Sequence, residues 1–468
     1  MRTACAGSYV VAAGQLSGEQ TDNLAKELTL RPRQSAYSSV APDPIQCLSV
    51  DPAGGSLEMP RFFGVARFGP PADASGLADG EPMAADAHFL GRLRDDHRPQ
   101  VAAHDACVAE LGRAGLRGGL LVLPCGFGKT VVAIRIACTL ARRTIVVVGK
   151  DFLMQQWRRE IEEFVPGARV GRIQQDVVDV HGADFVLAMI QSLSARAYGA
   201  AVLGTFGLAV FDECHHVAAP CFNRAVRRLG ARRVLGLSAT PDRRDGLGPL
   251  LAWSLGDVLF RAARPATEVR VACLKYTGGA QREFRSRDGR AMIARMQTTL
   301  CDEPRRNAMI AREVAALYYA GRHTIVLSDR LEQLRALRLL VTSLGVPAAE
   351  IADYVGSTRP AAREAAEACD VILSTYSMAR EGLDVPRLDT LVMASPIGGV
   401  EQAVGRIQRG GADTQVPLVV DVHDPFGPFE RMHAGRRAYY RKAGFDVHAL
   451  ECAGAIHDRP AAWAVGAG

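Results

Sequence analysis

The sequence predicts an α/β protein built from two parallel-sheet domains in tandem. Apolar runs of strand type are each followed by a helical stretch, a texture typical of strands that helices cover on both faces. The pattern occurs in one series before residue 264 and in a second series after it. A chain of 468 residues with 48% hydrophobic content is long enough for two to four domains.

The first ninety residues differ in texture from the rest. Residues 1–90 are rich in Gly, Pro, Ala and Ser, which favours a small N-terminal module. Two islands in it, residues 9–13 and 62–65, are predicted to be strands. Residues 91–264 are the first predicted α/β domain, with strands expected at 120–124, 144–148, 185–190, 208–211 and 234–237.

The second predicted domain covers residues 265–450, and residues 451–468 form a tail. The polar stretch 278–307 has weak periodicity, and we interpret it as a linker or an inserted hairpin. Strands are expected at 268–275, 324–328, 371–374, 390–394 and 416–422.

Charge and cysteine usage limit the classes of protein. The chain has 56 basic and 50 acidic residues, and the net charge of +6 fits a polyanionic partner without requiring one. The eleven cysteines contain no CxxC pair, so neither a zinc ribbon nor a disulfide framework is expected, and a reducing compartment, cytoplasm or nucleus, is predicted. Residues 3–14 resemble a short signal sequence, but Gly7, Ser8 and Gly14 interrupt it. No run reaches the ~20 apolar residues of a membrane span.

A glycine-rich turn follows the first expected strand. Residues 124–130 read PCGFGKT and lead into a helical run at 131–140. Gly126 and Gly128 let backbone N–H groups face a polyphosphate, Lys129 reaches the β and γ phosphates, and the Thr130 hydroxyl is a ligand for Mg²⁺. The pattern predicts an ATP site, although Leu123 stands where the GxxxxGK[ST] motif has its first glycine. The alternative is an ordinary loop.

Two carboxylates follow the strand expected at 208–211. We predict that Asp212 holds Mg²⁺ through water and that Glu213 orients and deprotonates the attacking water. A solvated acidic turn is the alternative. His215 and His216 come next, but adjacent side chains diverge and no further ligands stand nearby, so metal binding by this pair is not favoured; Cys214 is interpreted as a buried filler.

With these motifs, the chain from Arg98 to beyond Arg409 resembles the superfamily 2 helicases, and within them the XPB-related branch, whose phosphate loop also reads LPCGxGK[ST]. The resemblance implies that Gln100, in the RPQ element, reads the adenine base. Motifs in the first half imply further roles: contact with the nucleic-acid strand for Gln155, Gln191 and Ser192, and coupling of hydrolysis to movement for Ser238 and Thr240 of the SAT element.

Motifs of the second half complete the resemblance. Thr375 is implied to contact the phosphodiester backbone, and Gly382 with Asp384 to face the nucleotide. Residues 402–409 reproduce QxxGRxxR, which implies catalytic roles for Gln402, Arg406 and Arg409. Arginines three apart share a helix face, and one is expected to act as an arginine finger on the γ-phosphate. The alternative is a basic helix face on solvent or DNA.

The resemblance implies two RecA-like domains that use ATP and Mg²⁺ to move along nucleic acid, DNA in preference to RNA, with contacts to phosphate rather than to bases. Transcription or repair proteins are compatible partners, and no membrane is involved. Alternatives are an RNA helicase, a duplex translocase without unwinding, and a binding module that has lost its ATPase. The last is least expected because Lys129, Asp212, Glu213 and Arg409 are all present.

Two features modify this expectation. Residues 241–246 read PDRRDG, and Arg244 replaces the acid of the Arg-Glu-Asp element that related proteins use in duplex opening, which puts unwinding by this element in doubt. Residues 58–64 and 68–69 resemble the N-terminal part of helicases encoded by large DNA viruses. This second resemblance allows a viral protein that acts inside a host cell.

Overall fold

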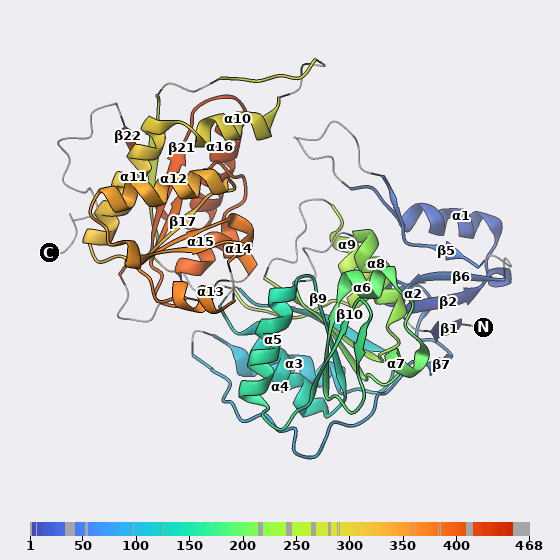
Figure 1. Ribbon diagram of the computed structural model, residues 1–468. Coiled ribbons are helices and arrows are strands. Elements are labelled where there is room, and N and C mark those ends of the chain that lie inside the picture. Colours follow the sequence, from blue (N-terminus) through green and yellow to red (C-terminus); the bar gives the residue numbers. More distant parts are fainter. Residues whose placement is uncertain are drawn as a thin grey trace. The chain divides into compact units, whose positions relative to one another are not determined.

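The chain divides into two compact units, Met1–Ala263 and Arg264–Gly468, which we describe separately (Figure 1). None of the helices in the described ranges combines the length and apolar character that crossing a bilayer requires. The computed structural model describes residues 2–5, 7–32, 43–51, 55–96, 98–124, 126–213, 219–239, 246–263, 268–278, 282–287, 289, 291–358, 360–381, 383, 385–408 and 415–452.

The first unit contains a central sheet with the strand order β11-β10-β12-β9-β13-β14-β8-β15. Its strands are parallel except β11, which pairs antiparallel with β10. The five strands predicted in this part are confirmed as β8, β9, β12, β13 and β14, while β10, β11 and β15 were not predicted. Their bounds are β8 Arg117–Val122, β9 Thr144–Val148, β10 Val170–Gln174, β11 Val177–Asp179, β12 Phe185–Met189, β13 Leu208–Phe211, β14 Arg233–Ser238 and β15 Val258–Arg261.

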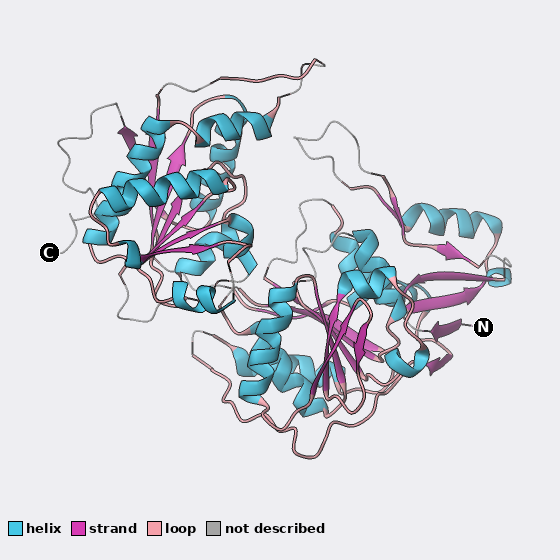
Figure 2. Ribbon diagram, viewed as in Figure 1, coloured by secondary structure: helices cyan, strands magenta, loops and turns pink. Residues whose placement is uncertain are grey.

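Helices cover both faces of this sheet (Figure 2). Alternate side chains of each strand enter different cores, since Ile145 and Val147 pack on one face and Val146 and Val148 on the other. The continuous apolar runs of the sequence follow from this double burial. The helices of one face are α3 Gln100–Leu111, α4 Lys129–Leu140 and α5 Asp151–Phe164; those of the other are α6 Ile190–Ala195, α7 Ala200–Leu203, α8 Ala219–Arg228 and α9 Gly248–Leu255.

The N-terminal part of the first unit has its own sheet, in the order β5-β6-β2-β1-β7, shown in blue in Figure 1. The strand predicted at 9–13 is confirmed as β2. Strands β3 and β4 pair with each other in a separate two-stranded sheet. The elements of the N-terminal part are β1 Arg2–Cys5, β2 Ser8–Ala12, η1 Ala13–Gln15, α1 Gly18–Glu27, β3 Thr29–Leu30, β4 Ile45–Gln46, β5 Ser49–Val50, β6 Ser56–Pro60, α2 Arg61–Phe68 and β7 Asp73–Gly76.

The strand predicted at residues 62–65 is wrong, because this segment lies inside helix α2. A short apolar run does not reveal its period, and here packing decides it. Arg61 and Gly64, one helical turn apart, are both buried, and a Cβ on Gly64 would lie 2.2 Å from the Tyr9 ring. Helical geometry therefore brings this glycine face against β2.

The N-terminal sheet shares its core with the central sheet. Tyr9, Val11 and Phe63 belong to the same buried cluster as Phe222 of α8 and Leu250 of α9. Polar contacts reinforce the junction near the end of α8: buried Arg61 donates to the carbonyl oxygens of Ala231 (2.9 Å) and Leu229 (2.7 Å), the Gly7 amide donates to the Arg227 carbonyl (3.0 Å), and Arg227 donates to Ser49 Oγ (2.5 Å).

The second unit is built on a parallel sheet with the order β18-β19-β17-β20-β21-β16-β22. The predicted strands are confirmed as β16, β17, β19, β20 and β21, and β18 and β22 were not predicted. Its strands are β16 Arg270–Tyr276, β17 Thr324–Leu327, β18 Ile351–Tyr354, β19 Val371–Ser374, β20 Thr390–Met393, β21 Leu418–His423 and β22 Asp446–Cys452. Its helices are α10 Ile293–Cys301, α11 Pro304–Tyr319, α12 Leu331–Ser343, η3 Ala348–Glu350, α13 Pro360–Ala366, α14 Tyr376–Glu381, α15 Glu401–Ile407 and α16 Gly427–Lys442.

In the described residues of the stretch interpreted as a linker or hairpin, 278–307, Arg285 and Ala291 form an isolated antiparallel bridge. Helix α10 and the start of α11 follow it. Tertiary packing explains why this segment is helical: Met296 and Leu300 lie on one side of α10 and pack with Phe429 of α16 in a small buried cluster.

Candidate nucleotide and nucleic-acid site

The parallel strands of the first unit end at a common edge, and the predicted site residues follow these ends. Lys129 begins α4 after β8, and Asp212 follows β13 directly. Ser238 ends β14, which pairs with β8, so that the Leu123 amide donates to the Ser238 carbonyl (3.1 Å). Since the carboxyl ends of parallel strands collect at one edge of an α/β sheet, these groups lie in the usual place for a ligand.

The turn between β8 and α4 has the backbone that its glycines predict. Gly126 and Gly128 have φ of 83° and 77°, in the left-handed region that side chains rarely adopt. Gly128 is the N-cap of α4, and the N–H groups of the first helical turn therefore point toward this loop. Thr130, half-buried, lies in that turn. Such a terminus binds anions.

Gln100 braces this loop from the start of α3. Its side chain is buried, with Nε2 donating to the Phe127 carbonyl (2.9 Å) and Oε1 accepting from the Arg94 amide (2.8 Å). A Cβ on Gly128 would lie 2.4 Å from Gln100 Nε2. The close approach gives Gly128 a packing reason in addition to its φ, and base reading by Gln100 stays a prediction.

Lys129 and the two carboxylates meet at this edge. Lys129 Nζ lies 3.5 Å from Glu213 Oε1 and 3.5 Å from the Leu123 carbonyl oxygen. Glu213 has φ of 44°, a left-handed conformation that costs a non-glycine residue about 1–3 kcal/mol. Such strain persists where the surroundings require a particular side-chain direction, and here it accompanies the approach of Glu213 to Lys129.

Asp212 is held by Trp157, and this contact was not predicted from the sequence. Trp157 Nε1 donates to Asp212 Oδ2 (2.8 Å), and the Glu213 amide donates to Oδ1 (2.9 Å). Burial, and after it the charge of Glu213, raises the pKa of Asp212 to about 6, against the lowering effects of the Trp157 hydrogen bond and Lys129. The QW motif named this tryptophan, but its partner lies 55 residues away in sequence.

The residues of the first unit predicted to contact a nucleic-acid strand differ in solvent exposure. Gln155 is exposed on α5, with Nε2 donating to Asp151 Oδ2 (2.7 Å), and exposed Gln191 donates to the Gly149 carbonyl (2.8 Å). Ser192 is buried, and its Oγ accepts from the Gln175 amide (2.8 Å). Gln155 and Gln191 therefore offer polar groups to a ligand, whereas Ser192 faces inward.

Several predicted residues lie outside the described part of the chain. In the first unit these are Cys214, His215, His216 and Thr240, together with Arg244. In the second unit they are Gly382, Asp384 and Arg409.

In the second unit, Thr375 lies between β19 and α14, directly before the helix. Its Oγ1 accepts from the Met378 amide (3.4 Å), as a helix-capping hydroxyl does. Gln402 is half-buried on α15. Arg406, on the same helix, is buried, and its Nη1 donates to the Leu383 carbonyl (2.7 Å). This contact gives Arg406 an internal partner beside the loop predicted to face the nucleotide.

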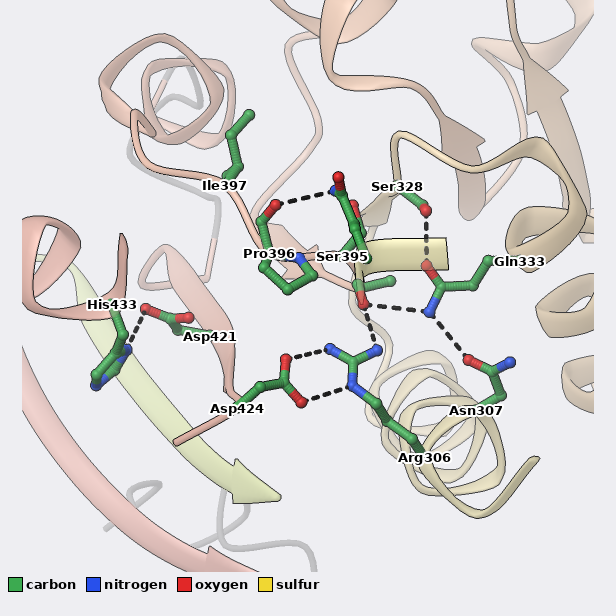
Figure 3. Close-up of polar contacts among 12 residues, drawn as sticks. Arg306, Asn307, Ser328, Gln333, Ser395, Pro396, Ile397, Asp421, Asp424 and His433 are labelled. Carbon is green, nitrogen blue, oxygen red and sulfur yellow. Dashed lines mark hydrogen bonds and ion pairs between the residues drawn. The ribbon is translucent and has the colours of Figure 1, made fainter. Parts of the chain in front are cut away.

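A buried polar network that sequence reasoning missed ties together the carboxyl ends of β17, β20 and β21 (Figure 3). Arg306 of α11 makes two hydrogen bonds to Asp424 (2.9 and 2.8 Å) and one to the Ala394 carbonyl (2.6 Å). Gln333 of α12 accepts from Ser328 Oγ (2.6 Å) and also donates to the Ala394 carbonyl (3.2 Å). The network fixes the loops after three adjacent strands.

Cys273, Asp421 and His433 bring three ligand atoms within 4.8 Å of one another in the second unit. The cluster is not suited to a metal ion, because Arg436 makes a bidentate contact to Asp421 (Nη2–Oδ1 2.7 Å, Nε–Oδ2 2.9 Å) and Tyr440 donates to the same carboxylate (3.0 Å). A guanidinium already neutralises the charge that would attract a cation.

Known proteins resemble the chain in sequence. Residues 95–243 match the family described as Type III restriction enzyme, res subunit. A protein of Acanthamoeba polyphaga mimivirus, provisionally named ATP-dependent RNA helicase L396, is 28% identical over 450 residues, covering 94% of this chain and 85% of the relative. The African swine fever virus (isolate Tick/Malawi) protein provisionally named ATP-dependent RNA helicase QP509L is 28% identical over 358 residues, 70% of this chain and 69% of its own.

Solved structures resemble it in fold. Saccharomyces cerevisiae Dbp5, bound to RNA and ADP BeF3, has a TM-score of 0.51 at 11% identity and covers 75% of this chain and 89% of its own. The Type ISP restriction-modification enzyme LlaBIII, bound to DNA, has a TM-score of 0.50 at 15% identity and covers 77% of this chain and 32% of its own. The predicted fold of tandem RecA-like domains is confirmed.

Fold, site and relatives together define an ATP-dependent enzyme of the helicase class. The chain is similar to superfamily 2 helicases, including helicases of large DNA viruses.

Proposed function

We propose that the chain is a nucleic-acid-stimulated ATPase that moves along DNA, with Mg²⁺ as the metal. The observation that carries this proposal is the shared edge of the first unit, where Lys129, Asp212 and Glu213 lie on the same side of the sheet as exposed Gln155 and Gln191. A ligand on those side chains touches the helices that follow β9 and β12, and β9 lies beside β13, the strand that Asp212 follows.

The side chains at this edge fit a magnesium nucleotide. The donor set is an ammonium, a hydroxyl and two carboxylates, the chemistry that phosphate oxygens and Mg²⁺ require. Thr130 and, through water, Asp212 would hold the ion, which polarises the phosphoryl group when bound. Gly126, Gly128 and the first turn of α4 would cradle the phosphates.

The remaining steps belong to the protein's own groups. Lys129 neutralises charge on the β and γ phosphates, and Glu213 accepts the proton of the attacking water at its carboxylate. Gln100 would add base recognition, and Ser238 with Thr240 would couple hydrolysis to movement. Gln402 and Arg409 would assist the transferred phosphoryl group, and Gly382 with Asp384 would face the nucleotide.

We propose DNA as the nucleic acid along which the protein moves, because the matching family is described as a restriction-enzyme subunit. Thr375 joins Gln155 and Gln191 as the proposed contacts to the nucleic-acid backbone, whereas buried Ser192 is not proposed as a contact. An RNA helicase is the second candidate, favoured by the provisional names of the mimivirus and African swine fever virus relatives. Because these relatives are viral, we further propose action inside an infected cell, with transcription or repair proteins as partners.

The test is ATP hydrolysis and unwinding measured in parallel on DNA and RNA duplexes with single-stranded tails. DNA should stimulate hydrolysis, with little dependence on base sequence and a steep loss of affinity between low and physiological salt, because phosphate contacts release counterions. Stimulation by RNA alone would select the second candidate. Hydrolysis without unwinding would indicate a duplex translocase, as Arg244 suggests, and a rate indifferent to both nucleic acids would refute the proposal.

A further inference from the structure

Helix α5 carries both the residue expected to contact nucleic acid and a residue that makes a hydrogen bond to the proposed metal site. Gln155 is exposed on this helix, and two residues later Trp157 is buried, with 1% of its surface exposed. The indole Nε1 donates to Asp212 Oδ2 at 2.8 Å, and Asp212 itself is 7% exposed. Both partners of this hydrogen bond are therefore almost shielded from water, where polar contacts are strongest.

The indole suits a role in orienting this carboxylate. It is a neutral donor with no acceptor, so it binds one carboxylate oxygen without competing for a cation. The Glu213 amide binds the other oxygen, and the two donors together fix the plane of the carboxylate. The ring itself has little freedom, because it belongs to the core that includes Leu153 and Ile161 of the same helix.

We propose that Trp157 is a positioning residue: it orients Asp212 for the metal-bound water, and it transmits the contact of a nucleic-acid strand with Gln155 through α5 to the metal site. This inference rests on the proposed function. The path is short, because α5 packs against α4, whose first turn carries Lys129 and Thr130, and against β9, the strand beside β13. A small shift of α5 on strand binding moves the indole and the carboxylate together.

The test compares Trp157→Phe with the matched control Trp253→Phe, since Trp253 of α9 packs against Phe63 of α2 in the other core. Loss of an outer-shell partner typically costs about 10- to 100-fold in metal affinity or activity. We expect Trp157→Phe to raise the Mg²⁺ concentration for half-maximal hydrolysis about tenfold and to reduce stimulation by nucleic acid. Affinity for ATP without metal should change less than twofold, and Trp253→Phe should behave as the unchanged protein.

A Trp157→Phe protein with unaltered Mg²⁺ dependence and unaltered stimulation would overturn the inference. An unchanged protein that hydrolyses no ATP with any nucleic acid would instead refute the proposed function. If Trp157→Phe does not fold, the chain with Trp253→Phe and Trp463→Phe keeps Trp157 as its one tryptophan. Its emission should change when Mg²⁺ joins a bound non-hydrolysable ATP analogue, and an emission unaffected by Mg²⁺ would also overturn the inference.

Discussion

Lys129 Nζ and Glu213 Oε1 lie 3.5 Å apart, yet the proposed chemistry gives the two side chains different tasks. Lys129→Ala should abolish hydrolysis, because the charge that neutralises the β and γ phosphates is lost. Glu213→Gln should still bind ATP and Mg²⁺ but hydrolyse slowly, since the water loses its base. Equilibrium nucleotide binding and single-turnover hydrolysis separate the two effects. Loss of nucleotide binding in Glu213→Gln would show that the roles are assigned wrongly.

At the scale of one element, α15 carries one arginine that has an internal partner. Arg406 is buried against the Leu383 carbonyl, so Arg406→Ala should lower the free energy of unfolding by about 2 kcal/mol. Arg409→Ala should instead keep stability and ATP affinity while lowering turnover by about 10³, and Arg409→Lys should recover little, because an ammonium lacks the planar fork.

Thermal unfolding and single-turnover hydrolysis, measured on all three arginine variants, distinguish these roles. Stability and turnover that fall together in Arg409→Ala would make Arg409 a docking residue. Full stability with lost turnover in Arg406→Ala would instead make Arg406 the arginine finger.

Helix α2 anchors the N-terminal sheet through one buried arginine. Burial lowers the pKa of Arg61 to about 10, so its guanidinium is charged at neutral pH. Arg61→Met removes the donors of the Ala231 and Leu229 carbonyls and should destabilise the first unit by about 3 kcal/mol. Arg67→Met on the same helix is the control, because Arg67 is exposed. Equal melting temperatures for the two variants would contradict an anchoring role.

At the scale of the whole molecule, the stability of the second unit should decrease as the pH falls into the acid range. Burial alone would raise the pKa of Asp421, but the charge of Arg436, then the hydrogen bonds of His433 and Arg436, hold it well below its usual range. A carboxylate with a depressed pKa stabilises the fold above its unfolded pKa of about 4, and this contribution is lost as the pH falls further.

Asp421→Asn should therefore lower stability at pH 7 by about 3 kcal/mol or more, because Arg436 is left buried without its counter-charge. The difference in melting temperature between the two proteins should shrink as the pH falls below about 4. A difference that stays constant from pH 7 to pH 3 would show that the ionised Asp421 contributes no stability through this pair.

The sequence alone was sufficient for five adjacent strands in each of the two large sheets. Runs such as 144–148 are apolar at every position because both faces are buried, and this signal is local. The phosphate loop is also local, since Gly126, Gly128, Lys129 and Thr130 are consecutive or nearly so. Edge strands such as β11 and β15 were missed because they are short and partly exposed, so they carry no continuous apolar run.

Only the tertiary structure decided which distant groups meet. Nothing near Trp157 in the sequence indicates Asp212, and nothing near Arg306 indicates Asp424, because each pair forms across elements that the sheet brings together. The segment at 62–65 is helical for the same reason, since Gly64 fits against Tyr9 in a helix. The sequence by itself determined the fold class and the chemistry of its motifs, because backbone periodicity and glycine turns are local. The partners of buried polar groups are set by packing, which acts between residues far apart in the chain.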